Sequence, residues 1–295
     1  KQPDHNSEQY LAEAIDCVLG QTYQNWELII WNNKSTDKTK SIASSYEDVR
    51  IKIYNSENFT SLGAARNLAL NIAKGEFIAF LDSDDIWYPK KLETMLPRFK
   101  NNKVGICISN THFFNSKGQK TLYTQTKPQI GKVFKYLLKN NFISLETVML
   151  RSSATNNILF NEKYNMIEEY DYLLRLSKSC ELDYVDETLS GWRVHGNSIT
   201  QKTPNLLAEE LEDMLITLKD EIENFELSFP EEIKSLRSKI LLLKVIYNNK
   251  NYSISEIIHI LRNSGAGILA IMGAFLINFI PFRIRIFIIK IKRRF

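Results

Sequence analysis

The sequence predicts an α/β fold, a mostly parallel sheet followed by an all-helical carboxyl-terminal extension. Two observations predict it. Through the first two thirds of the 295 residues, apolar stretches of strand length alternate with helical patterns, which is typical of parallel sheets. From Pro204 onward the pattern is helical only. Because 44% of the residues are hydrophobic, the chain can bury the core of one or two domains.

The expected elements alternate along the chain. Strands are expected where short apolar runs occur, at 26–31, 51–54, 77–81 and 104–110. Helices are expected where the apolar spacing is helical, at 9–19, 37–46, 62–73 and 90–100. A polar segment with a proline, 115–129, is expected to form a loop or a hairpin. Residues 205–232 are expected to form an amphipathic helix that packs on the main domain or on a partner.

Charge and cysteine content exclude some classes of protein. The net charge of +4 is too small to indicate a nucleic-acid partner. Cys17, Cys107 and Cys180 are scattered and odd in number, so they form no disulfide framework and no zinc spacing, and buried thiols in a reducing cytosol are expected. The polar stretch 1–8 shows no signal peptide.

Three carboxylates, Asp82, Asp84 and Asp85, directly follow the apolar run 77–81, which we expect to be a buried parallel strand. Like charges this close repel, so a cation is expected to offset them. Carboxylate oxygens suit Mg²⁺ or Mn²⁺, and ligands of open α/β sheets bind beyond the carboxyl ends of strands. The alternative is an acidic turn that caps the following helix.

The run from Gly75 to Leu92 resembles the metal-binding segment of the family-two glycosyltransferases, which are inverting enzymes with the type-A nucleotide-sugar transferase fold. Further stretches resemble other motifs of that family in the same order, at residues 10–30, 35–37, 63–67, 167–176 and 192–198. The resemblance covers residues 6 to 200. It implies a Rossmann-like sheet of the type-A kind and a bound Mn²⁺ or Mg²⁺.

The resemblance also assigns roles to individual residues. Asp84 is expected to bind the metal directly, Asp82 to lie near ribose or metal, and Asp85 to support them or cap the next helix. Without the family context, Arg66 would be read as an exposed helical arginine and His195 as a structural histidine. The expected metal ligands are Asp82, Asp84 and His195. The expected donor contacts are Asn6, Asn32, Asn33, Arg66, Asp82, Arg193 and His195.

The general base is expected among three acidic residues of one short helix. The family usually has Glu-Asp where this chain has Glu168-Glu169, and the family's Asp acts as the base. The matching residue is therefore Glu169, with Glu168 beside it and Asp171 in reserve. A carboxylate is a competent base when burial raises its pKa. The alternative is a pair of capping or exposed helical acids.

Two stretches depart from the family. The family begins with an apolar strand that ends Pro-x-Tyr-Asn, whereas residues 1–6 keep only Pro3 and Asn6, so the chain is expected to be truncated or a fragment. The loss of a central strand would leave sheet edges unpaired. The family's Asp-Asp after its second strand is Asn32-Asn33 here, which can still accept a uracil N–H but without charge assistance.

The chain is expected to divide into a nucleotide-sugar-binding half at 1–110, an acceptor-side half at 111–203 and a helical extension at 204–295. Residues 264–282 carry no formal charge, and 283–295 carry six basic residues among aliphatic ones. This pattern favours a helix lying on an anionic membrane surface, the inner face of the cell membrane, over a transmembrane span. The alternative is a helix pair packed on the body.

The expected function is transfer of a sugar from a nucleotide-sugar, a UDP-sugar, to a glycan or lipid-linked acceptor, in synthesis of surface polysaccharide, O-antigen or glycolipid. A second hypothesis is a non-catalytic nucleotide-sugar or glycan-binding relative that acts as a membrane scaffold, motivated by the altered amino end and by Asn32-Asn33. A third is a nucleotidyltransferase, which is disfavoured because no basic Gly-rich loop is visible near the start.

Overall fold

The computed structural model describes residues 6–115, 117–124, 126–155, 158–195 and 204–247. Two compact units are present. The first comprises residues 1–134 and 142–198, and the second comprises 135–141 and 199–295. The predicted division of the first part at residue 110 stays a prediction. The tail at 264–295 lies outside the described residues.

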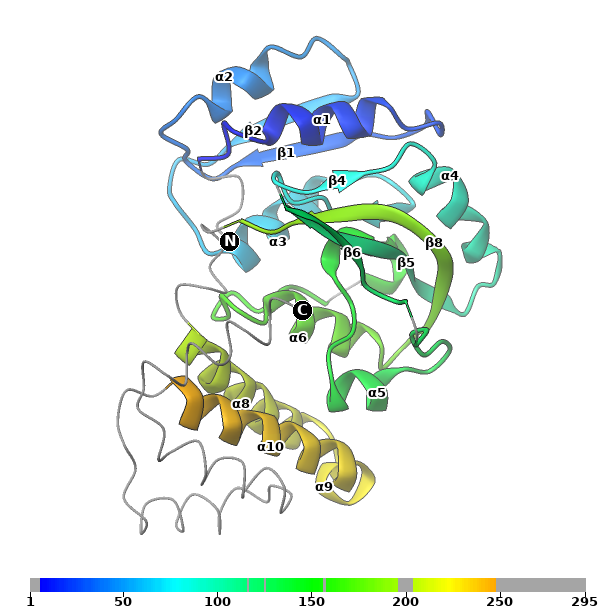
Figure 1. Ribbon diagram of the computed structural model, residues 1–295, viewed down its shortest axis with the longest axis vertical. Helices are drawn as coiled ribbons and strands as arrows, with labels where there is room; N and C mark the ends of the chain where they lie inside the picture. Colours follow the sequence, from blue (N-terminus) through cyan, green and yellow to red (C-terminus); the bar gives the residue numbers. More distant parts are fainter. Residues whose placement is uncertain (1–5, 116, 125, 156–157, 196–203, 248–295) are drawn as a thin grey trace. The chain divides into compact units, whose positions relative to one another are not determined.

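The first unit contains a two-stranded parallel sheet with β1 (Leu28–Asn32) beside β2 (Ile51–Asn55). Helices α1 (Leu11–Leu19) and α2 (Thr39–Ser44) pack on this sheet, as Figure 1 shows. Their apolar contact joins Leu11, Ile15, Ile30 and Ala43. The positions 11 and 15 are one turn apart, so they lie on the same face of α1.

Helix α3 (Leu62–Ile72) follows β2 and packs against β1. It begins at Ser61, whose Oγ accepts a hydrogen bond from the Ala64 N–H at 3.3 Å and so satisfies one of the free amides of the first turn. The helix brings Arg66, which is 8% exposed, to the same region as the acidic cluster.

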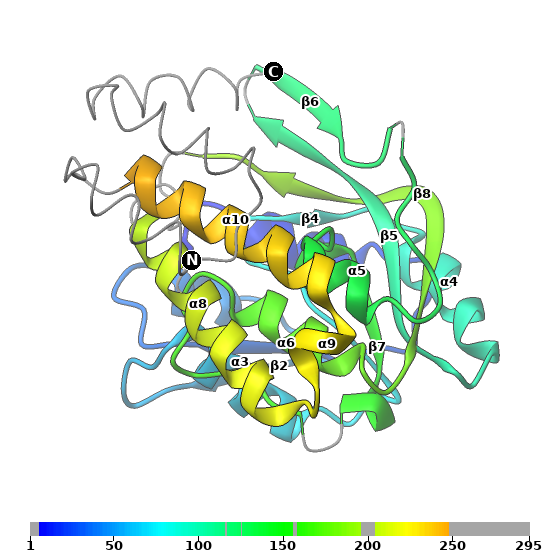
Figure 2. The same cartoon turned by 90° about the horizontal axis from the view of Figure 1, so that it is seen from below.

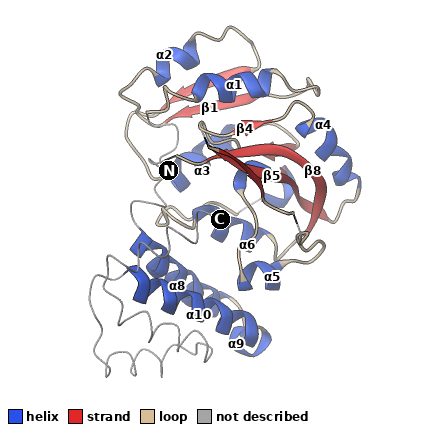
Figure 3. Cartoon of the chain, in the orientation of Figure 1, coloured by secondary structure: helices blue, strands red, loops and turns tan. Residues whose placement is uncertain are grey.

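The second sheet has six strands in the order β3-β7-β5-β8-β4, with β6 beside β5. Its pairs are mixed: β5 and β8 run parallel, and the other pairs are antiparallel. The strands, drawn in red in Figure 3, are β3 (Phe77–Ala79), β4 (Ile86–Trp87), β5 (Val104–Asn115), β6 (Gly118–Thr121), β7 (Val148–Arg151) and β8 (Glu181–Arg193).

Strand β5 is the centre of this sheet. Its first nine residues are all buried, as expected of a strand with neighbours on both edges and cover on both faces. The hairpin expected at 115–129 is formed by β5 and β6, and Figure 2 shows β8 beside them. Two further helices complete the unit, α4 (Lys91–Met95), continued by a 3₁₀ turn at Leu96–Lys100, and α6 (Glu168–Leu176).

The strand expected at 77–81 differs from the prediction. The observed β3 has three residues, pairs antiparallel with β7, and is only partly buried. The partial burial follows because its other edge faces a cavity, and no described strand pairs with that edge.

The second unit contains α8 (Pro204–Glu221), α9 (Phe225–Ser228) and α10 (Pro230–Tyr247). Helix α5 (Phe134–Lys139) lies at its boundary in the sequence. Helices α8 and α10 pack against each other, and an ion pair joins Lys244 to Glu212 at 2.6 Å. Within the described ranges, no helix is both long enough and apolar enough to cross a membrane.

Candidate active site

The three carboxylates predicted from sequence lie in the turn between β3 and β4. One carboxylate oxygen from each of Asp82, Asp84 and Asp85 lies within 4.8 Å of the others. The turn is closed by the Asp85 N–H, which donates to the Asp82 carbonyl at 2.9 Å. Asp84 and Asp85 are buried and Asp82 is partly exposed. Hard oxygen donors in this arrangement fit Mg²⁺ or Mn²⁺.

The end of β8 closes over this turn. The Arg193 N–H donates to Asp85 Oδ1 at 2.9 Å, and the Arg193 Nε donates to the Asp84 carbonyl at 2.9 Å. Beyond the strand, His195 Nε2 lies 2.7 Å from Asp84 Oδ2. Residues more than 100 positions apart in sequence are therefore joined at the acidic cluster, and His195 lies beside Asp84, the expected metal ligand.

Arg66 connects the acidic turn to helix α6. Its Nη2 donates to Asp82 Oδ1 at 2.9 Å and its Nη1 donates to Glu168 Oε1 at 3.0 Å. Glu168 is 4% exposed. A guanidinium suits this role because its planar fork presents donors to two carboxylates at once. The contact joins the acidic turn to the first residue of α6, beside the expected base Glu169.

The Arg66→Met variant is expected to lower the free energy of unfolding by about 3–5 kcal/mol, because it leaves the buried Glu168 carboxylate unpaired. Urea denaturation monitored by circular dichroism measures this loss. The double variant with Glu168→Gln is expected to recover part of it.

A matched control is Lys127→Met, which breaks the exposed pair of Lys127 with Asp186 at 2.5 Å. The loss there is expected to stay below about 1 kcal/mol, the usual size for a surface pair. If Arg66→Met lowers the free energy of unfolding by no more than this control, Arg66 does not hold the acidic turn and helix α6 together.

The three candidate bases on α6 have different surroundings. Glu168 is paired with Arg66, and Asp171 Oδ2 accepts hydrogen bonds from Arg175 Nε and Nη2 at 3.0 and 2.6 Å. The Glu169 carboxylate forms no hydrogen bond or ion pair with any described residue. Of the three, Glu169 is therefore the one whose oxygens are available to accept a proton from a substrate.

The pKa of Glu169 is raised to about 8. Burial is the main cause, and the neighbouring Glu168 carboxylate adds to it, while Arg66 opposes it. A carboxyl group with a raised pKa holds a proton more strongly and is a better base near neutral pH. This is the shift expected of a general base, and a cation bound nearby would lower the pKa again.

Comparison with known protein families identifies the family of this chain. The model of glycosyl transferase family 2 matches residues 3–159, more than half of the chain. The chain belongs to this family. The prediction made from its motifs is thus confirmed.

Individual relatives agree with this family 2 assignment. The chain is 36% identical over 175 residues to WfgD of Escherichia coli, a UDP-Glc:alpha-D-GlcNAc-diphosphoundecaprenol beta-1,3-glucosyltransferase. The match covers 59% of this chain and 66% of WfgD, slightly less than two thirds of that relative.

Two solved structures share the fold. TarS 1–349 of S. aureus, in complex with UDP-GlcNAc, has a TM-score of 0.68 at 18% identity, over 94% of this chain and 86% of that one. PcManGT, a mannosyltransferase of Pyrobaculum calidifontis in complex with GDP-Man and Mn²⁺, has a TM-score of 0.57 at 13% identity, over 93% and 84%. These similarities confirm the predicted α/β fold of the type-A glycosyltransferases.

The asparagines expected to contact the donor serve the protein's own structure. Asn33 is fully buried, and its amide both donates to the Thr60 carbonyl and accepts from the Thr60 N–H, at 2.8 and 3.1 Å. Asn32 is 3% exposed and donates to Asn55 Oδ1 at 2.9 Å. The structure therefore does not bring these two amides to an accessible surface, and their contact with a nucleotide stays a prediction.

Asn6 is bonded to the loop that follows β1. Its N–H donates to Ser35 Oγ at 3.2 Å, and its Oδ1 accepts from the Thr36 N–H at 3.0 Å. Its φ of 59° is left-handed, a conformation that asparagine adopts more readily than most residues. Asn6 is exposed, and its contact with a donor stays a prediction.

Sequence reasoning missed three residues of the site. Tyr10 and Glu13 both hold the end of β8: the Arg193 guanidinium lies 4.5 Å from the Tyr10 ring centre and 2.5 Å from Glu13. Glu146 is 4% exposed, and burial raises the pKa of its carboxyl group. Tyr10 precedes α1 and Glu13 lies in its first turn, and nothing in the sequence around Glu146 marks it.

Proposed function

We propose that this family 2 member is an inverting glycosyltransferase that moves a sugar from a nucleotide-sugar to an acceptor hydroxyl during synthesis of a surface polysaccharide, O-antigen or glycolipid. One observation carries the proposal. Glu169, a base candidate that forms no hydrogen bond or ion pair within the described part of the chain, adjoins Glu168, which Arg66 links to a cluster of three carboxylates suited to a divalent cation.

The residues divide the reaction between them. Mn²⁺ or Mg²⁺ held by Asp82 and Asp84, with His195 beside Asp84, would offset the charge on the leaving nucleoside diphosphate. Glu169 accepts the proton of the acceptor hydroxyl. The acceptor oxygen then bonds to the anomeric carbon on the face opposite the diphosphate, and the bond to the diphosphate breaks with its electron pair. The anomeric configuration is thereby inverted.

Arg66 has a positioning role in this proposal. Both of its Nη atoms are paired with carboxylates, one on the metal side and one on the base side. It therefore aligns the metal side of the site with the helix that carries the base. Such alignment of reacting groups speeds catalysis. A direct contact of Arg66 with the diphosphate, as the family resemblance implies, requires that a bound donor replace one of these pairs.

A UDP-sugar is the proposed donor and a lipid-linked glycan the proposed acceptor. WfgD is named for UDP-glucose and a diphosphoundecaprenol acceptor, and TarS was solved with UDP-GlcNAc. The buried Asn32 and Asn33 provide no charged contact for the nucleobase of the donor. The proposal that this nucleobase is uracil therefore rests on WfgD and TarS.

The test is a set of nucleotide-sugars incubated with the protein and Mn²⁺, with and without a lipid-linked glycan. Donor-dependent release of a nucleoside diphosphate supports a transferase. Binding without release would indicate the non-catalytic scaffold, and release of pyrophosphate would indicate a nucleotidyltransferase.

Membrane attachment of the tail is a separate proposal. Residues 283–295 contain six basic residues and no acidic one, so each is expected to contribute about 1 kcal/mol of attraction to an anionic surface. This attachment would place the site at the inner face of the cell membrane, near a lipid-linked acceptor.

Deletion of residues 264–295 is expected to abolish sedimentation with anionic vesicles while leaving donor hydrolysis intact. High salt is expected to weaken the binding of the full chain, because surface charges are screened. Neutral vesicles serve as the control. Binding that resists salt and carbonate and yields only to detergent would contradict surface attachment, as would no vesicle binding at all.

A further inference from the structure

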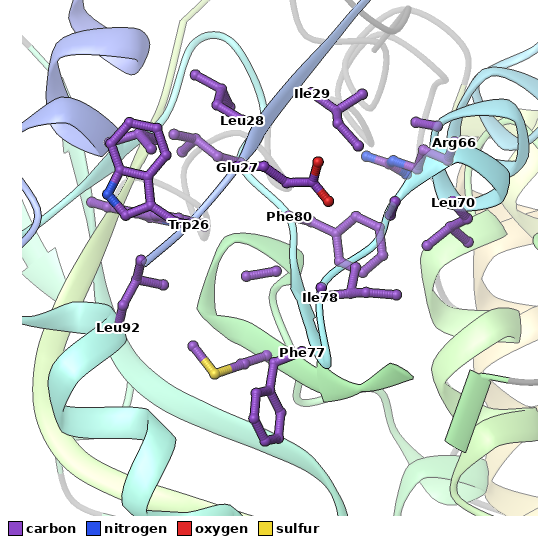
Figure 4. A pocket seen from close by; sticks show the side chains of 18 of the residues that line it. Trp26, Glu27, Leu28, Ile29, Arg66, Leu70, Phe77, Ile78, Phe80 and Leu92 are labelled. Atoms are coloured by element: carbon purple, nitrogen blue, oxygen red, sulfur yellow. The ribbon is translucent and has the colours of Figure 1, made fainter. Parts of the chain in front are cut away.

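Glu146 lies at the end of the sheet where the acidic turn begins. Strands β3 and β7 run antiparallel, so the carboxyl end of β3 lies beside the amino end of β7. Asp82 follows β3 and Glu146 precedes β7, each within three residues of its strand. Figure 4 shows Phe80, between β3 and Asp82, in the wall of the same cavity as Arg66, which binds Asp82. The turn that carries Glu146 therefore adjoins the acidic turn.

The Glu146 carboxyl group interacts with both sides of the proposed reaction. Burial is the main cause of the raised pKa of Glu146 and of Glu169, and neighbouring charges add to it. Asp82 raises the pKa of Glu146, and Glu146 raises the pKa of Glu169. Carboxyl groups affect one another in this way when they are close together and shielded from water. Glu146 therefore lies close to the expected metal site, through Asp82, and to the expected base.

One oxygen of Glu146 lacks a partner. The residue is 4% exposed, and its Oε2 accepts a hydrogen bond from Ser144 Oγ. Its Oε1 is buried and forms no hydrogen bond with any described residue. The Thr111 hydroxyl lies nearby but donates its one proton to the Ser190 carbonyl at 3.0 Å. Because buried polar atoms are almost always paired, Oε1 indicates a hydrogen-bonding group that a ligand brings.

The other titratable groups around Glu146 are engaged elsewhere. Lys91 is fully buried, and its Nζ donates to the Thr147 carbonyl at 3.1 Å. It attracts the Glu146 carboxylate, but in the described part of the chain the two form no ion pair. The Tyr123 hydroxyl donates to the Phe142 carbonyl. Neither side chain therefore satisfies Glu146 Oε1.

The turn that carries Glu146 is fixed by the segment that follows the aspartates. Trp87 Nε1 donates to the Glu146 carbonyl at 3.0 Å, and the bond from Lys91 holds the next carbonyl. Within the turn, the Thr147 N–H and Oγ1 both donate to the Ser144 carbonyl, at 3.0 and 2.6 Å. The carboxyl group is thus held in one place before a ligand binds, which lowers the entropic cost of binding.

The proposed reaction identifies the ligand. The acceptor oxygen attacks the anomeric carbon on the face opposite the diphosphate, so the transferred sugar lies between the metal side and Glu169. Glu146 is close to both. A sugar also carries several hydroxyl groups, each of which can donate a hydrogen bond to a carboxylate or accept one from a protonated carboxyl group.

We propose that Glu146 recognises the sugar of the donor, by a hydrogen bond between its carboxyl group and one hydroxyl of the sugar that is transferred. Glu146 is then a residue that determines which sugar is accepted, and it transfers no proton. This inference rests on the proposed function, because it requires a sugar between the metal and Glu169.

The test is a calorimetric titration, in Mn²⁺, of UDP, UDP-glucose and UDP-GlcNAc into the unaltered chain and into Glu146→Met. Methionine keeps the size of the side chain and removes both oxygens. The affinity for the UDP-sugar is expected to fall by about 10- to 100-fold, the usual value of a hydrogen bond to a charged group, and the affinity for UDP to stay unchanged. Glu187→Met makes the same change at an exposed position of β8 and is expected to alter neither affinity.

A second titration identifies the hydroxyl group. It uses analogues of the bound UDP-sugar that each lack one hydroxyl. The unaltered chain is expected to bind one analogue about 10- to 100-fold more weakly, whereas Glu146→Met binds that analogue and the complete UDP-sugar equally. The two losses do not add when both changes remove the same hydrogen bond. Additive losses, or no loss with any analogue, would overturn the proposal.

Thermal unfolding without donor separates recognition from a structural role. Glu146→Met is expected to unfold at a temperature no lower than the unaltered chain, because it removes a buried oxygen that has no partner. A lower unfolding temperature, with equal losses of affinity for UDP and for the UDP-sugar, would show a structural role and overturn the proposal. Glu146→Gln keeps the shape of the side chain and is expected to show a smaller loss, again for the UDP-sugar only.

Two further outcomes distinguish this inference from the proposed function. Unchanged donor affinity with a raised KM for the glycan acceptor would assign Glu146 to the acceptor and overturn the inference alone. Sugar affinity that depends on Glu146, in a chain that transfers no sugar, would uphold the inference and contradict the proposed function. Binding of neither UDP nor a UDP-sugar would contradict both.

Discussion

The Asp84→Asn variant is expected to lose the manganese-dependent part of donor binding while remaining folded. Asp84 is buried, contributes to the cluster of carboxylate oxygens and contacts His195 at 2.7 Å. The loss is expected to be about 100-fold or more, because replacing groups that merely orient a metal ligand already weakens metal binding by about 10–100-fold. Calorimetric titration with UDP-sugar, with Mn²⁺ and with chelator, measures it.

The control for this variant is Asp186→Asn, which removes a largely exposed carboxylate paired with Lys127. It is expected to bind the donor as the unaltered chain does. Thermal unfolding of both variants shows that the loss is local. Donor affinity that is equal in the unaltered chain and in Asp84→Asn, with and without chelator, would contradict a metal role for this residue.

The Glu169→Gln variant is expected to retain donor binding and to lose transfer by about two to four orders of magnitude, the usual contribution of a positioned base. Glutamine keeps the shape of the side chain but cannot accept the proton. Glu168→Gln and Asp171→Asn are the matched controls, since each removes a neighbouring carboxylate that a guanidinium already holds. If one of these is inactive while Glu169→Gln turns over, the assignment is wrong.

The pH dependence gives a second measurement of the same residue. The base must be unprotonated, so the rate is expected to rise with pH until the pKa of Glu169 is passed. That pKa is about 8 without metal, and a bound cation is expected to move it down toward its ordinary value of 4.5. The acid side of the profile should therefore reach its midpoint between these two values. In Glu169→Gln this dependence is expected to disappear.

Local patterns made much of the site predictable. The run of aspartates after an apolar stretch and the acidic motif at 167–176 both led to groups that meet in the structure, although they are about 85 residues apart. The helices at 9–19 and 62–73 were also recovered to within two residues, because their apolar spacing is regular. Site residues can be predicted from the sequence when the chemistry is concentrated in a few neighbouring residues.

Long-range pairing was not predictable in the same way. The contact of Arg66 with Asp82 and Glu168 spans 16 and 102 positions, and no feature of Arg66 itself distinguishes a buried connector from an exposed helical arginine. Asn33 was expected to contact the donor because it stands where the family has an aspartate after its second strand, yet both ends of its amide are bonded to Thr60. Strand β8, which positions Arg193 and His195, was absent from the prediction because its sequence mixes charged and apolar residues.

The most direct test of the proposed function follows the anomeric centre during transfer. The protein is incubated with Mn²⁺, an α-linked UDP-sugar and a lipid-linked glycan acceptor, and the product is examined by proton NMR. A β-linked product that forms with metal, does not form with chelator, and is lost in Glu169→Gln is the predicted result. An α-linked product, or equal transfer in the presence of chelator, would contradict a metal-assisted inverting reaction at this site.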